Sequence, residues 1–425
     1  MPPSLGRIRE SLTTPLGRRQ LRRGIGYRSF FLLKHFARFY RETALRRTTV
    51  VTVIGSFGKS TTVRTVRAAL GLPDALNTWN SFQGIAFNLL RSPRGSRFAV
   101  LEAGIDGPGQ MARYARMLRP DVVVVTSIGS EHKRSLQTLE TTRREKAAML
   151  TGLPQSGLAV GAADDPNVRW MLGQTRARTA TFGRSADADV RLLETRIEWP
   201  HGTRLRVRLP NGEREVLAKL FGRPGEDAIL AALATASGVG LPVTEVIERL
   251  ERVEPTASRL RVEPLPGGAW LLCDEFKSAL ETIDAAFDVL ADIPAARKQI
   301  VLGAISEPPS PQGPVYRRIG ERAGAIAERL VLVGSEKNLR LLRAGALATR
   351  SSCEVLSART ASEAAELVAL DLRPGDVVLV KGRDTQKLSR VSLRLRGIEV
   401  GCDIVLCEEK PLCATCPALV KGPHA

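Results

Sequence analysis

The chain has 425 residues but no apolar run that approaches the ~20 residues of a membrane-spanning helix. Its first residues lack the compact apolar core of a secretory signal. Histidine occurs four times, and only two of the six cysteines precede residue 402. Low-complexity tracts and short-period repeats are also absent. These absences exclude spanning helices and a conventional secreted protein, so we expect a cytoplasmic protein.

Acidic side chains are nearly missing from the first 49 residues, which carry twelve Lys and Arg against Glu10 and Glu42. This segment holds about half of the formal net charge of +19. Apolar residues recur there at helical spacing, and two interpretations remain open. The helix either docks residues 1–49 on the inner membrane surface or an acidic partner protein, or packs on its own domain with a solvated basic face. An Arg-rich start also fits a transit peptide, and no accompanying module predicts specific nucleic-acid binding. The apolar positions are Phe30, Leu33, Phe36 or Ala37, Tyr40 and Ala44.

The most informative stretch is an apolar, β-branched run that ends at Gly55 and leads into Gly58-Lys59-Ser60 and a helical pattern. A glycine-rich turn between a strand and a helix directs backbone N–H groups and the helix N-terminus at an anion. We therefore expect Lys59 to reach the outer phosphates of ATP and the Ser60 hydroxyl to bind Mg²⁺. The alternative is a plain turn with an exposed lysine, since Val53 stands where the common motif has its first glycine. The predicted phosphate-binding residues are Gly55, Ser56, Gly58, Lys59, Ser60 and Thr61.

Strands and helices alternate along most of the chain, which predicts an α/β fold with mostly parallel sheets in two domains. Alternating apolar residues around Pro-Asn-Gly at 210–212 predict a small antiparallel β insertion in the first domain. The second domain is expected to be Rossmann-like. We expect four segments: a basic amphipathic start at 1–47, a P-loop central domain at 48–257, a second α/β domain at 258–395 and a cysteine-rich tail at 396–425.

Two polar groups follow predicted strands beside the phosphate loop. Glu102 comes after the run at 98–101, and His132 follows the run at 121–126. In open α/β sheets, ligands bind outside the carboxyl ends of the strands. A carboxylate and an imidazole there can hold a divalent cation. We therefore expect a second Mg²⁺ at Glu102 and His132, although a lone histidine after a strand is more often structural.

Several motifs occur in an order that resembles the Mur ligase family, whose members make amide bonds with ATP. Gly-Ser-Phe-Gly-Lys-Ser-Thr at 55–61 is similar to the family's G-T-x-G-K-T-[ST], and Leu-Glu-Ala-Gly-Ile at 101–105 looks like its second-metal motif. The block at 126–146 matches its T-N-I-G-x-x-H … G-S-x-E … K landmarks. The resemblance covers about residues 48 to 395. Within the family it is greatest to the branch that adds D-alanyl-D-alanine to the UDP-muramoyl tripeptide.

The resemblance implies a mechanism and further site residues. A substrate carboxylate attacks the γ-phosphate of ATP to give an acyl phosphate, and an amine then displaces phosphate. Lys59, Lys146 and His132 are the implied catalytic residues, while Arg259 and Asp274 match nucleotide contacts of the family. The family lysine matched by Lys146 is carbamoylated and becomes a carboxylate-like metal ligand. Without the resemblance, Lys146 would be interpreted as a solvated helix residue.

The sequence departs from the family pattern at several points. Residues 224–227 replace an H-N-x-x-N motif, and Lys277 and Ala279 stand where relatives have asparagines. Tyr316 replaces a histidine. Only about fifty residues precede the phosphate loop. That length is too short for the separate domain that holds the UDP portion of muramoyl substrates, so we expect this N-terminal UDP-binding domain to be missing.

We therefore expect an ATP-dependent ligase that forms an amide (peptide) bond, in cell-wall peptide synthesis or a related amino-acid ligation. Its cofactors would be ATP and Mg²⁺, and its partner a small-molecule or peptide substrate. Two alternatives remain open. One is a nucleotide-binding scaffold with reduced catalysis that docks on membranes or partner proteins, and the other is a polyglutamate-type ligase of the same architecture.

Four cysteines lie within fifteen residues as C-x4-C-x5-C-x2-C, in a chain that is otherwise poor in cysteine. Such clustering without a secretory signal favours a metal over disulfides. A structural Zn²⁺ site and an iron–sulfur cluster both remain open, because the context at 410–417 resembles cysteine loops of cluster-bearing repair glycosylases. The alternative is four reduced thiols. The predicted ligands are Cys402, Cys407, Cys413 and Cys416.

Overall fold

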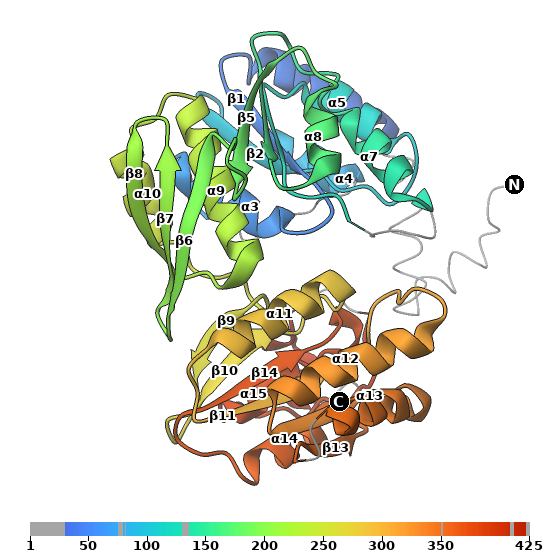
Figure 1. The fold of residues 1–425 in the computed structure, drawn as a ribbon. Helices are drawn as coiled ribbons and strands as arrows, with labels where there is room; N and C mark the ends of the chain where they lie inside the picture. Colours follow the sequence, from blue (N-terminus) through green and yellow to red (C-terminus); the bar gives the residue numbers. More distant parts are fainter. Residues whose placement is uncertain are drawn as a thin grey trace, which may run out of the picture. The chain divides into compact units, whose positions relative to one another are not determined.

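The structure of the protein is a computed structural model. It describes residues 30–74, 80, 82–129, 136–349, 352–408 and 412–421. The contacts between residues divide the chain into two compact units (Figure 1). Unit 1 holds the described residues up to Thr195 together with Leu205–Val216 and Asp227–Val253, and unit 2 holds Arg196–Arg204, Leu217–Glu226 and the described residues from Glu254 onward.

An eight-stranded sheet in the order β2-β1-β3-β4-β5-β6-β7-β8 forms the centre of unit 1. Every pair from β2 to β6 in this order is parallel. β6, β7 and β8 follow one another through short turns, so they run antiparallel. They are the small antiparallel part that the sequence predicted, and they extend the main sheet, because Val190 and Arg191 of β6 pair with β5. The strands are β1 (Thr49–Ile54), β2 (Phe98–Glu102), β3 (Val122–Val125), β4 (Leu158–Ala162), β5 (Arg178–Gly183), β6 (Val190–Glu198), β7 (Gly202–Leu209) and β8 (Gly212–Ala218).

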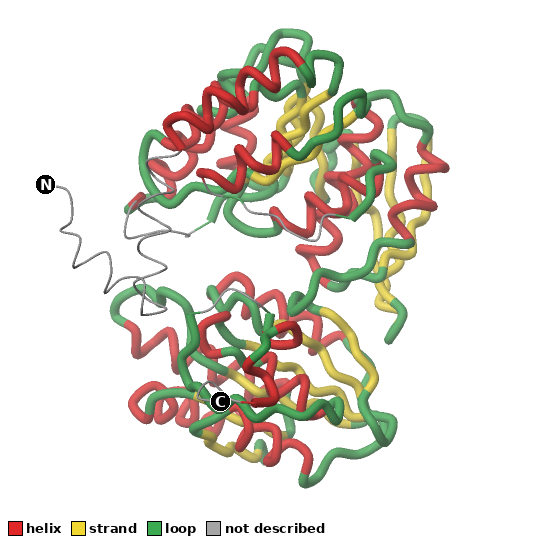
Figure 2. Tube along the Cα trace, turned by 180° about the vertical axis from the view of Figure 1, so that it is seen from behind, coloured by secondary structure: helices red, strands yellow, loops and turns green. Residues whose placement is uncertain are grey.

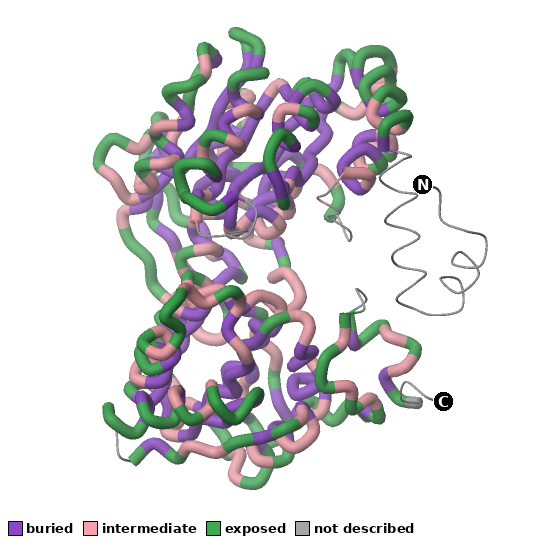
Figure 3. Tube along the Cα trace, turned by 90° about the vertical axis from the view of Figure 1, so that its right-hand side faces the viewer, coloured by how far each residue is buried: buried purple, intermediate pink, exposed green. Residues whose placement is uncertain are grey.

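Helices flank this sheet (Figure 2). The strands β2, β3 and β4 are buried along their whole length, as expected for parallel strands covered on both faces. Figure 3 shows that buried stretches of the chain lie inside each unit, while exposed stretches lie toward its outside. Residues 224–227, which replace the H-N-x-x-N motif of the family, lie in the first turns of the alanine-rich helix α9. The helices are α3 (Lys59–Ala69), α4 (Phe82–Leu90), α5 (Gln110–Leu118), α7 (Leu139–Ala147), α8 (Pro166–Leu172), α9 (Gly222–Gly238) and α10 (Val243–Glu251).

A helix over residues 30–43 packs one face on unit 1. Phe30 lies edge-on to Phe82, with ring centroids 5.4 Å apart. Arg41 is buried, and its guanidinium lies 2.8 Å from the carboxylate of Asp121. This face of the helix therefore packs on its own domain, which is one of the two interpretations that the sequence left open.

The predicted apolar positions of this helix do not all lie on the packed face. Phe30 and Ala37 are buried, and Tyr40 is half-buried with its hydroxyl donating to the carbonyl oxygen of Ser92 at 2.9 Å. Phe36, in contrast, is 68 % exposed. None of the helices in the described ranges is long and apolar enough to cross a bilayer.

Unit 2 is a three-layer sandwich around a six-stranded sheet in the order β13-β12-β11-β14-β10-β9. Only β9 runs antiparallel to its neighbour. Successive strand residues face opposite layers: Leu272 and Ile300 pack with α11 to α13, whereas Leu271 and Val301 pack with α14 and α15. The elements are β9 (Arg261–Pro264), β10 (Trp270–Asp274), α11 (Leu280–Asp292), β11 (Arg297–Leu302), α12 (Gln312–Ile326), β12 (Arg329–Val333), α13 (Glu336–Thr349), β13 (Glu354–Ala358), α14 (Ala361–Ala369), β14 (Asp376–Lys381), the 3₁₀ turn η1 (Asp384–Gln386), α15 (Ser389–Leu395), the 3₁₀ turn η2 (Cys413–Thr415) and α16 (Ala418–Lys421).

Candidate functional site

The strand register of unit 1 brings the predicted site segments to one edge of the sheet. β1 lies between β2 and β3 and is parallel to both, so the carboxyl ends of all three strands share that edge. Val53 pairs with Glu102, and Ile54 pairs with Val125. After β1 the chain forms β2 on one side of β1, and it then crosses over to form β3 on the other side. The edge at the carboxyl ends of these strands is therefore the topological switch point, where such sheets bind ligands.

The loop between β1 and α3 requires glycine at both ends. Gly55 has a φ of 140°, and a Cβ atom there would lie 2.0 Å from Oγ1 of Thr126. Gly58 has a φ of 80° and is the N-cap residue of α3. In the described part of the chain, no side chain caps this helix N-terminus, where Ser60 and Thr61 stand in the first turn. Its backbone N–H groups are therefore oriented as in an anion-binding helix terminus.

Two buried lysines meet at Ser56. The amino group of Lys59 donates to the carbonyl oxygens of Gly55 at 2.9 Å and Ser56 at 2.7 Å. The amino group of Lys146 donates to the hydroxyl of Ser56 at 3.0 Å. Lys146 is only 2 % exposed, so its interpretation as a solvated helix residue is wrong. A lysine from α7 thus reaches the predicted phosphate loop.

The helix that carries Lys146 is fixed at its start and along its length. Thr138 is its N-cap, and its hydroxyl accepts from the N–H of Thr141 at 3.0 Å. The carboxylate of Glu145 accepts from the N–H groups of Gly109 at 2.9 Å and Met111 at 3.0 Å, at the start of α5. These contacts hold α7 in the orientation that directs Lys146 inward.

Glu102 ends β2 as a buried carboxylate with one oxygen satisfied. Oε1 accepts from the side-chain amide of Asn80 at 2.7 Å, and the carbonyl oxygen of Asn80 accepts from the N–H of Gly104 at 2.8 Å. Within the described residues, Oε2 is buried without a hydrogen-bond partner. An unsatisfied buried carboxylate oxygen is costly, and a cation would satisfy it. Nothing in the sequence singled out Asn80, and His132 lies outside the described residues.

The turn after β3 holds the loop from the other side. The Thr126 hydroxyl donates to the carbonyl oxygen of Phe57 at 2.6 Å, and the N–H of Phe57 donates to the Ser127 hydroxyl at 3.2 Å. The N–H of Ile128 donates to Asp165 at 2.8 Å. Asp165 is also the N-cap of α8, and its Asp-Pro sequence carried a helix-start signal. It is a site-supporting residue that sequence reasoning missed.

The other two predicted nucleotide contacts, Arg259 and Asp274, lie in unit 2. Asp274 pairs in register with Lys381, whose Nζ lies 3.1 Å from its Oδ2. Burial raises the pKa of Asp274 and lowers the pKa of Lys381, while their mutual attraction opposes both shifts. The guanidinium carbon of Arg259 lies 4.7 Å from the ring centroid of Phe276. Unit 2 therefore places an arginine, an aromatic ring and a buried ion pair near the end of β10.

Glu275, next to that ion pair, is a titratable residue that sequence reasoning did not select. Its Oε1 accepts from the hydroxyl of Ser392 at 2.9 Å, and its Oε2 is buried with no partner among the residues that the structure describes. Burial raises the pKa of Glu275 to about 7. With that pKa, the carboxyl group is about half ionised near pH 7, whereas an ordinary glutamate is fully ionised there.

The cysteine tail contacts α15. Cys413 lies in a small core with three aliphatic side chains, and the guanidinium of Arg390 donates to the carbonyl oxygen of Cys402 at 3.0 Å. Across the described ranges, no three Cys, His, Asp or Glu side chains are grouped as ligands of a metal ion. The structure therefore does not show the predicted metal site at Cys402, Cys407, Cys413 and Cys416.

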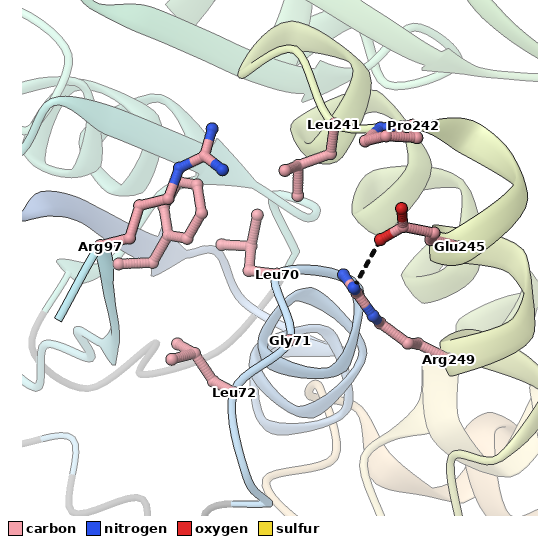
Figure 4. Close-up of a pocket in the computed structure, with 9 residues that line it drawn as sticks. Leu70, Gly71, Leu72, Arg97, Leu241, Pro242, Glu245 and Arg249 are labelled. Atoms are coloured by element: carbon pink, nitrogen blue, oxygen red, sulfur yellow. Dashed lines mark hydrogen bonds and ion pairs between the residues drawn. The ribbon is translucent and has the colours of Figure 1, made fainter.

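A cavity of about 570 Å³ lies at the end of α3 that is remote from the phosphate loop (Figure 4). Leu70 and Gly71, which follow α3, are among its lining residues. The length of α3 separates it from the loop by about 16 Å at 1.5 Å per residue. The guanidinium of Arg249 lies 2.8 Å from Glu245 and 3.2 Å from the carbonyl oxygen of Ala69. No predicted site residue lines this cavity, so it is distinct from the phosphate loop.

Comparisons with known proteins give consistent matches. Two family models match this chain: Mur ligase middle domain at residues 47–236, and Mur ligase, glutamate ligase domain at residues 260–383. The UDP-N-acetylmuramoyl-tripeptide–D-alanyl-D-alanine ligase of Mycobacterium tuberculosis is 28 % identical over 367 residues, which cover 81 % of this chain and 72 % of the relative.

Two solved structures extend this likeness to the fold. The MurF ligase of Thermotoga maritima in complex with ADP has a TM-score of 0.76 at 23 % identity, and the match covers 87 % of this chain and 84 % of that one. The folylpolyglutamate synthase of Mycobacterium tuberculosis, complexed with ADP and AMPPCP, has a TM-score of 0.63 at 16 % identity over 87 % of this chain and 95 % of that one.

Proposed function

Because this chain belongs to the Mur ligase family, we propose that it uses ATP to join a carboxylic acid to an amine through an acyl phosphate. The relative from M. tuberculosis is named for D-alanyl-D-alanine and a UDP-N-acetylmuramoyl tripeptide, and we assign the donor of this chain to the same cell-wall peptide class. The observation that carries the proposal is the meeting of Lys59 and Lys146 at Ser56.

The phosphate loop meets the main demands of phosphoryl transfer, which are positioning and neutralisation of charge. The N-terminus of α3 and Lys59 bind the phosphates of ATP. The Ser60 hydroxyl and the unpartnered oxygen of Glu102 would hold Mg²⁺, which would neutralise phosphate charge. The donor carboxylate attacks the γ-phosphorus, and ADP leaves. The amine then attacks the acyl carbon, the bond to the phosphate oxygen breaks, and the amine loses a proton as the amide forms.

Other predicted residues complete this assignment. Lys146 is a catalytic residue in the proposal because it touches the loop that binds the phosphates. In a carbamoylated form it would be a metal ligand, as the family resemblance implies. His132 is assigned to the second cation. Arg259 and Asp274 are assigned to the nucleotide, a role supported by the aromatic ring that Arg259 covers.

The test is substrate-dependent phosphate release by the full chain, with hydroxylamine present to trap an acyl phosphate as a hydroxamate. Muramoyl peptides and folyl glutamates serve as donors, and D-alanyl-D-alanine and single amino acids as amines. We expect an ATP-dependent hydroxamate from a muramoyl peptide. Lys59→Ala should lose about 10²-fold or more of the rate, whereas Lys219→Ala, at an exposed lysine, should keep it.

Two results would contradict the proposal. ATP binding without turnover on the whole panel would favour a scaffold with reduced catalysis. Turnover only with folyl glutamates would favour a polyglutamate-type ligase.

We further propose that the four tail cysteines bind one Zn²⁺ ion or one iron–sulfur cluster as thiolates. Their spacing within fifteen residues supports this, and so does their location on one segment beside α15. Burial raises the pKa of the Cys413 thiol, and coordination would reverse that shift because the thiolate is the ligand. Elemental analysis of the purified chain tests this proposal. Zinc in a colourless protein would indicate a Zn²⁺ site, and iron together with sulfide would indicate an iron–sulfur cluster. The absence of both would indicate four reduced thiols and contradict the proposal.

A further inference from the structure

The helix over residues 30–43 exposes an aromatic face opposite to the face that packs on unit 1. Phe31, Leu32, Phe36 and Phe39 are between 63 % and 68 % exposed. At 3.6 residues per turn, these four side chains fall within an arc of about 140°. The packed side chains, such as Phe30, lie on the other side of the helix.

This face is a concentrated patch. Of the exposed phenylalanines in the described part of the chain, three of four lie in this helix, and the fourth is Phe87. At ~200 Å² for a large apolar side chain, four side chains about two-thirds exposed present roughly 500 Å². A patch of that size is as large as the largest on typical monomers and is often functional.

Positive charge lies on and near the helix that carries the patch. The amino nitrogen of Lys34 lies 4.7 Å from the ring centroid of Phe31. The guanidinium carbon of Arg94 lies 5.8 Å from the ring centroid of Tyr40, which belongs to the same helix as Phe31. The sequence of residues 1–29, which leads directly into the helix, has seven arginines and one glutamate, a formal excess of six positive charges. A cationic segment is therefore joined directly to an exposed apolar face.

We propose that this helix docks the protein reversibly on an anionic phospholipid surface. Phenylalanine and leucine enter the boundary between headgroups and acyl chains, while the arginines attract anionic headgroups. A helix with phenylalanine and leucine on one face and basic residues beside it is typical of segments that lie in a membrane interface, and the test distinguishes this from an acidic protein partner. A lipid surface supplies both an apolar medium and a high density of negative charge, and thus matches both features.

The experiment is flotation of the full chain with vesicles of phosphatidylcholine alone or with about one third phosphatidylglycerol. We expect binding to the anionic vesicles that weakens with salt, because added ions screen the attraction. The triple variant Phe31→Ser, Phe36→Ser, Phe39→Ser should bind roughly tenfold or more weakly, since apolar area is lost. Leu370→Ser, at a residue that is 81 % exposed in unit 2, is the matched control and should bind like the parent.

The triple variant should keep the thermal midpoint and the phosphate release of the parent, because the three side chains face solvent. Three results would overturn the proposal. The first is an absence of flotation with either vesicle. The second is equal flotation of the triple variant, which would assign binding to charge alone. The third is phenylalanine-dependent dimerisation, or capture of an acidic protein, without vesicle binding.

Discussion

The carboxyl ends of the parallel strands in the two units carry similar residues but use them differently. In unit 1, Lys59 and Lys146 gather at Ser56 on a glycine loop, next to a helix N-terminus that no described side chain caps. In unit 2, Asp274 and Lys381 end neighbouring strands in register and pair at 3.1 Å. At the first edge the lysines lie on a loop of the kind that binds phosphate, whereas at the second edge the lysine is held in a buried charge pair.

The difference lies in what the lysine amino groups contact. Lys381 is fully buried, and besides Asp274 its amino group donates to the carbonyl oxygen of Lys277 and lies 3.3 Å from the hydroxyl of Thr282. It thereby fixes the segment that carries Phe276, against which Arg259 stacks. Strand topology selects the edge, but the loop that follows each strand decides whether that edge binds phosphate or stabilises the fold.

The largest expected effect is on stability and separates the two edges. Lys381→Met leaves the buried carboxylate of Asp274 without its cation and should lower the free energy of unfolding of unit 2 by about 3–5 kcal/mol. Lys59→Met removes hydrogen bonds to two loop carbonyl oxygens and should cost about 1–2 kcal/mol. Urea unfolding of both variants measures the difference.

Asp274→Leu combined with Lys381→Met is the control, because it leaves no unpaired charge in the site. The double variant should be more stable than Lys381→Met alone. Equal losses for Lys59→Met and Lys381→Met would mean that the two edges do not differ as described.

The next effect concerns pH and belongs to unit 2. Burial raises the pKa of Glu275 from an ordinary 4.5 to about 7. Between these values the unfolded chain is ionised while the folded carboxyl keeps its proton, so stability falls as pH rises through this window. The free energy of unfolding of the parent relative to Glu275→Gln should therefore fall by about 3 kcal/mol from pH 4.5 to 7. A difference that stays constant with pH in chemical denaturation would contradict the assignment.

A smaller effect distinguishes the two glycines of the phosphate loop. Gly55→Ala places a Cβ atom 2.0 Å from the Thr126 hydroxyl at a φ of 140°, so it should cost about 2–3 kcal/mol and weaken ATP binding. In Gly58→Ala the added Cβ atom lies 3.9 Å from its nearest heavy atom. Only the φ of 80° is then unfavourable, and it should cost about 1 kcal/mol of stability. Thermal unfolding and nucleotide titration of the two variants should rank them in this order, and a reversed ranking would refute the role of Thr126.

The sequence predicted the family and the fold class, and both are confirmed. Buried parallel strands such as β1 and β3 appear as short apolar runs because both of their faces are covered. The edge strands β9 and β13 are partly exposed and carry a weaker signal. The alternation of apolar and polar residues identified β6 to β8 as strands but not the strand with which they pair. This is because the two-residue period of side chains shows which face of a strand is buried, and not which strand lies beside it.

The candidate site was predictable where its residues are local in sequence or, like Glu102, end a strand of the parallel sheet. The phosphate loop is a contiguous spacing of glycines, lysine and serine, so its chemistry can be inferred from the sequence. The contact of Lys146 with Ser56 joins residues 90 positions apart, and only the family resemblance pointed to it. Asn80 is a single asparagine whose bond to Glu102 depends on the tertiary fold, so no pattern could have selected it.

The smallest expected effect compares two helix N-caps of the same kind. The Thr138 hydroxyl accepts from the N–H of Thr141 at 3.0 Å in unit 1, and the Thr360 hydroxyl accepts from the N–H of Glu363 at 3.1 Å in unit 2. Replacement of either threonine by alanine should cost about 1 kcal/mol of unfolding free energy.

Only α7, the helix that Thr138 caps, carries the lysine that contacts the phosphate loop. Thr138→Ala should therefore slow substrate-dependent phosphate release, because the start of that helix loosens, while Thr360→Ala should leave the rate unchanged. Both rates are measured at a temperature where both variants are folded. If the two variants lost the same activity, the loss would follow global stability, and the placement of Lys146 by its helix would not contribute to catalysis.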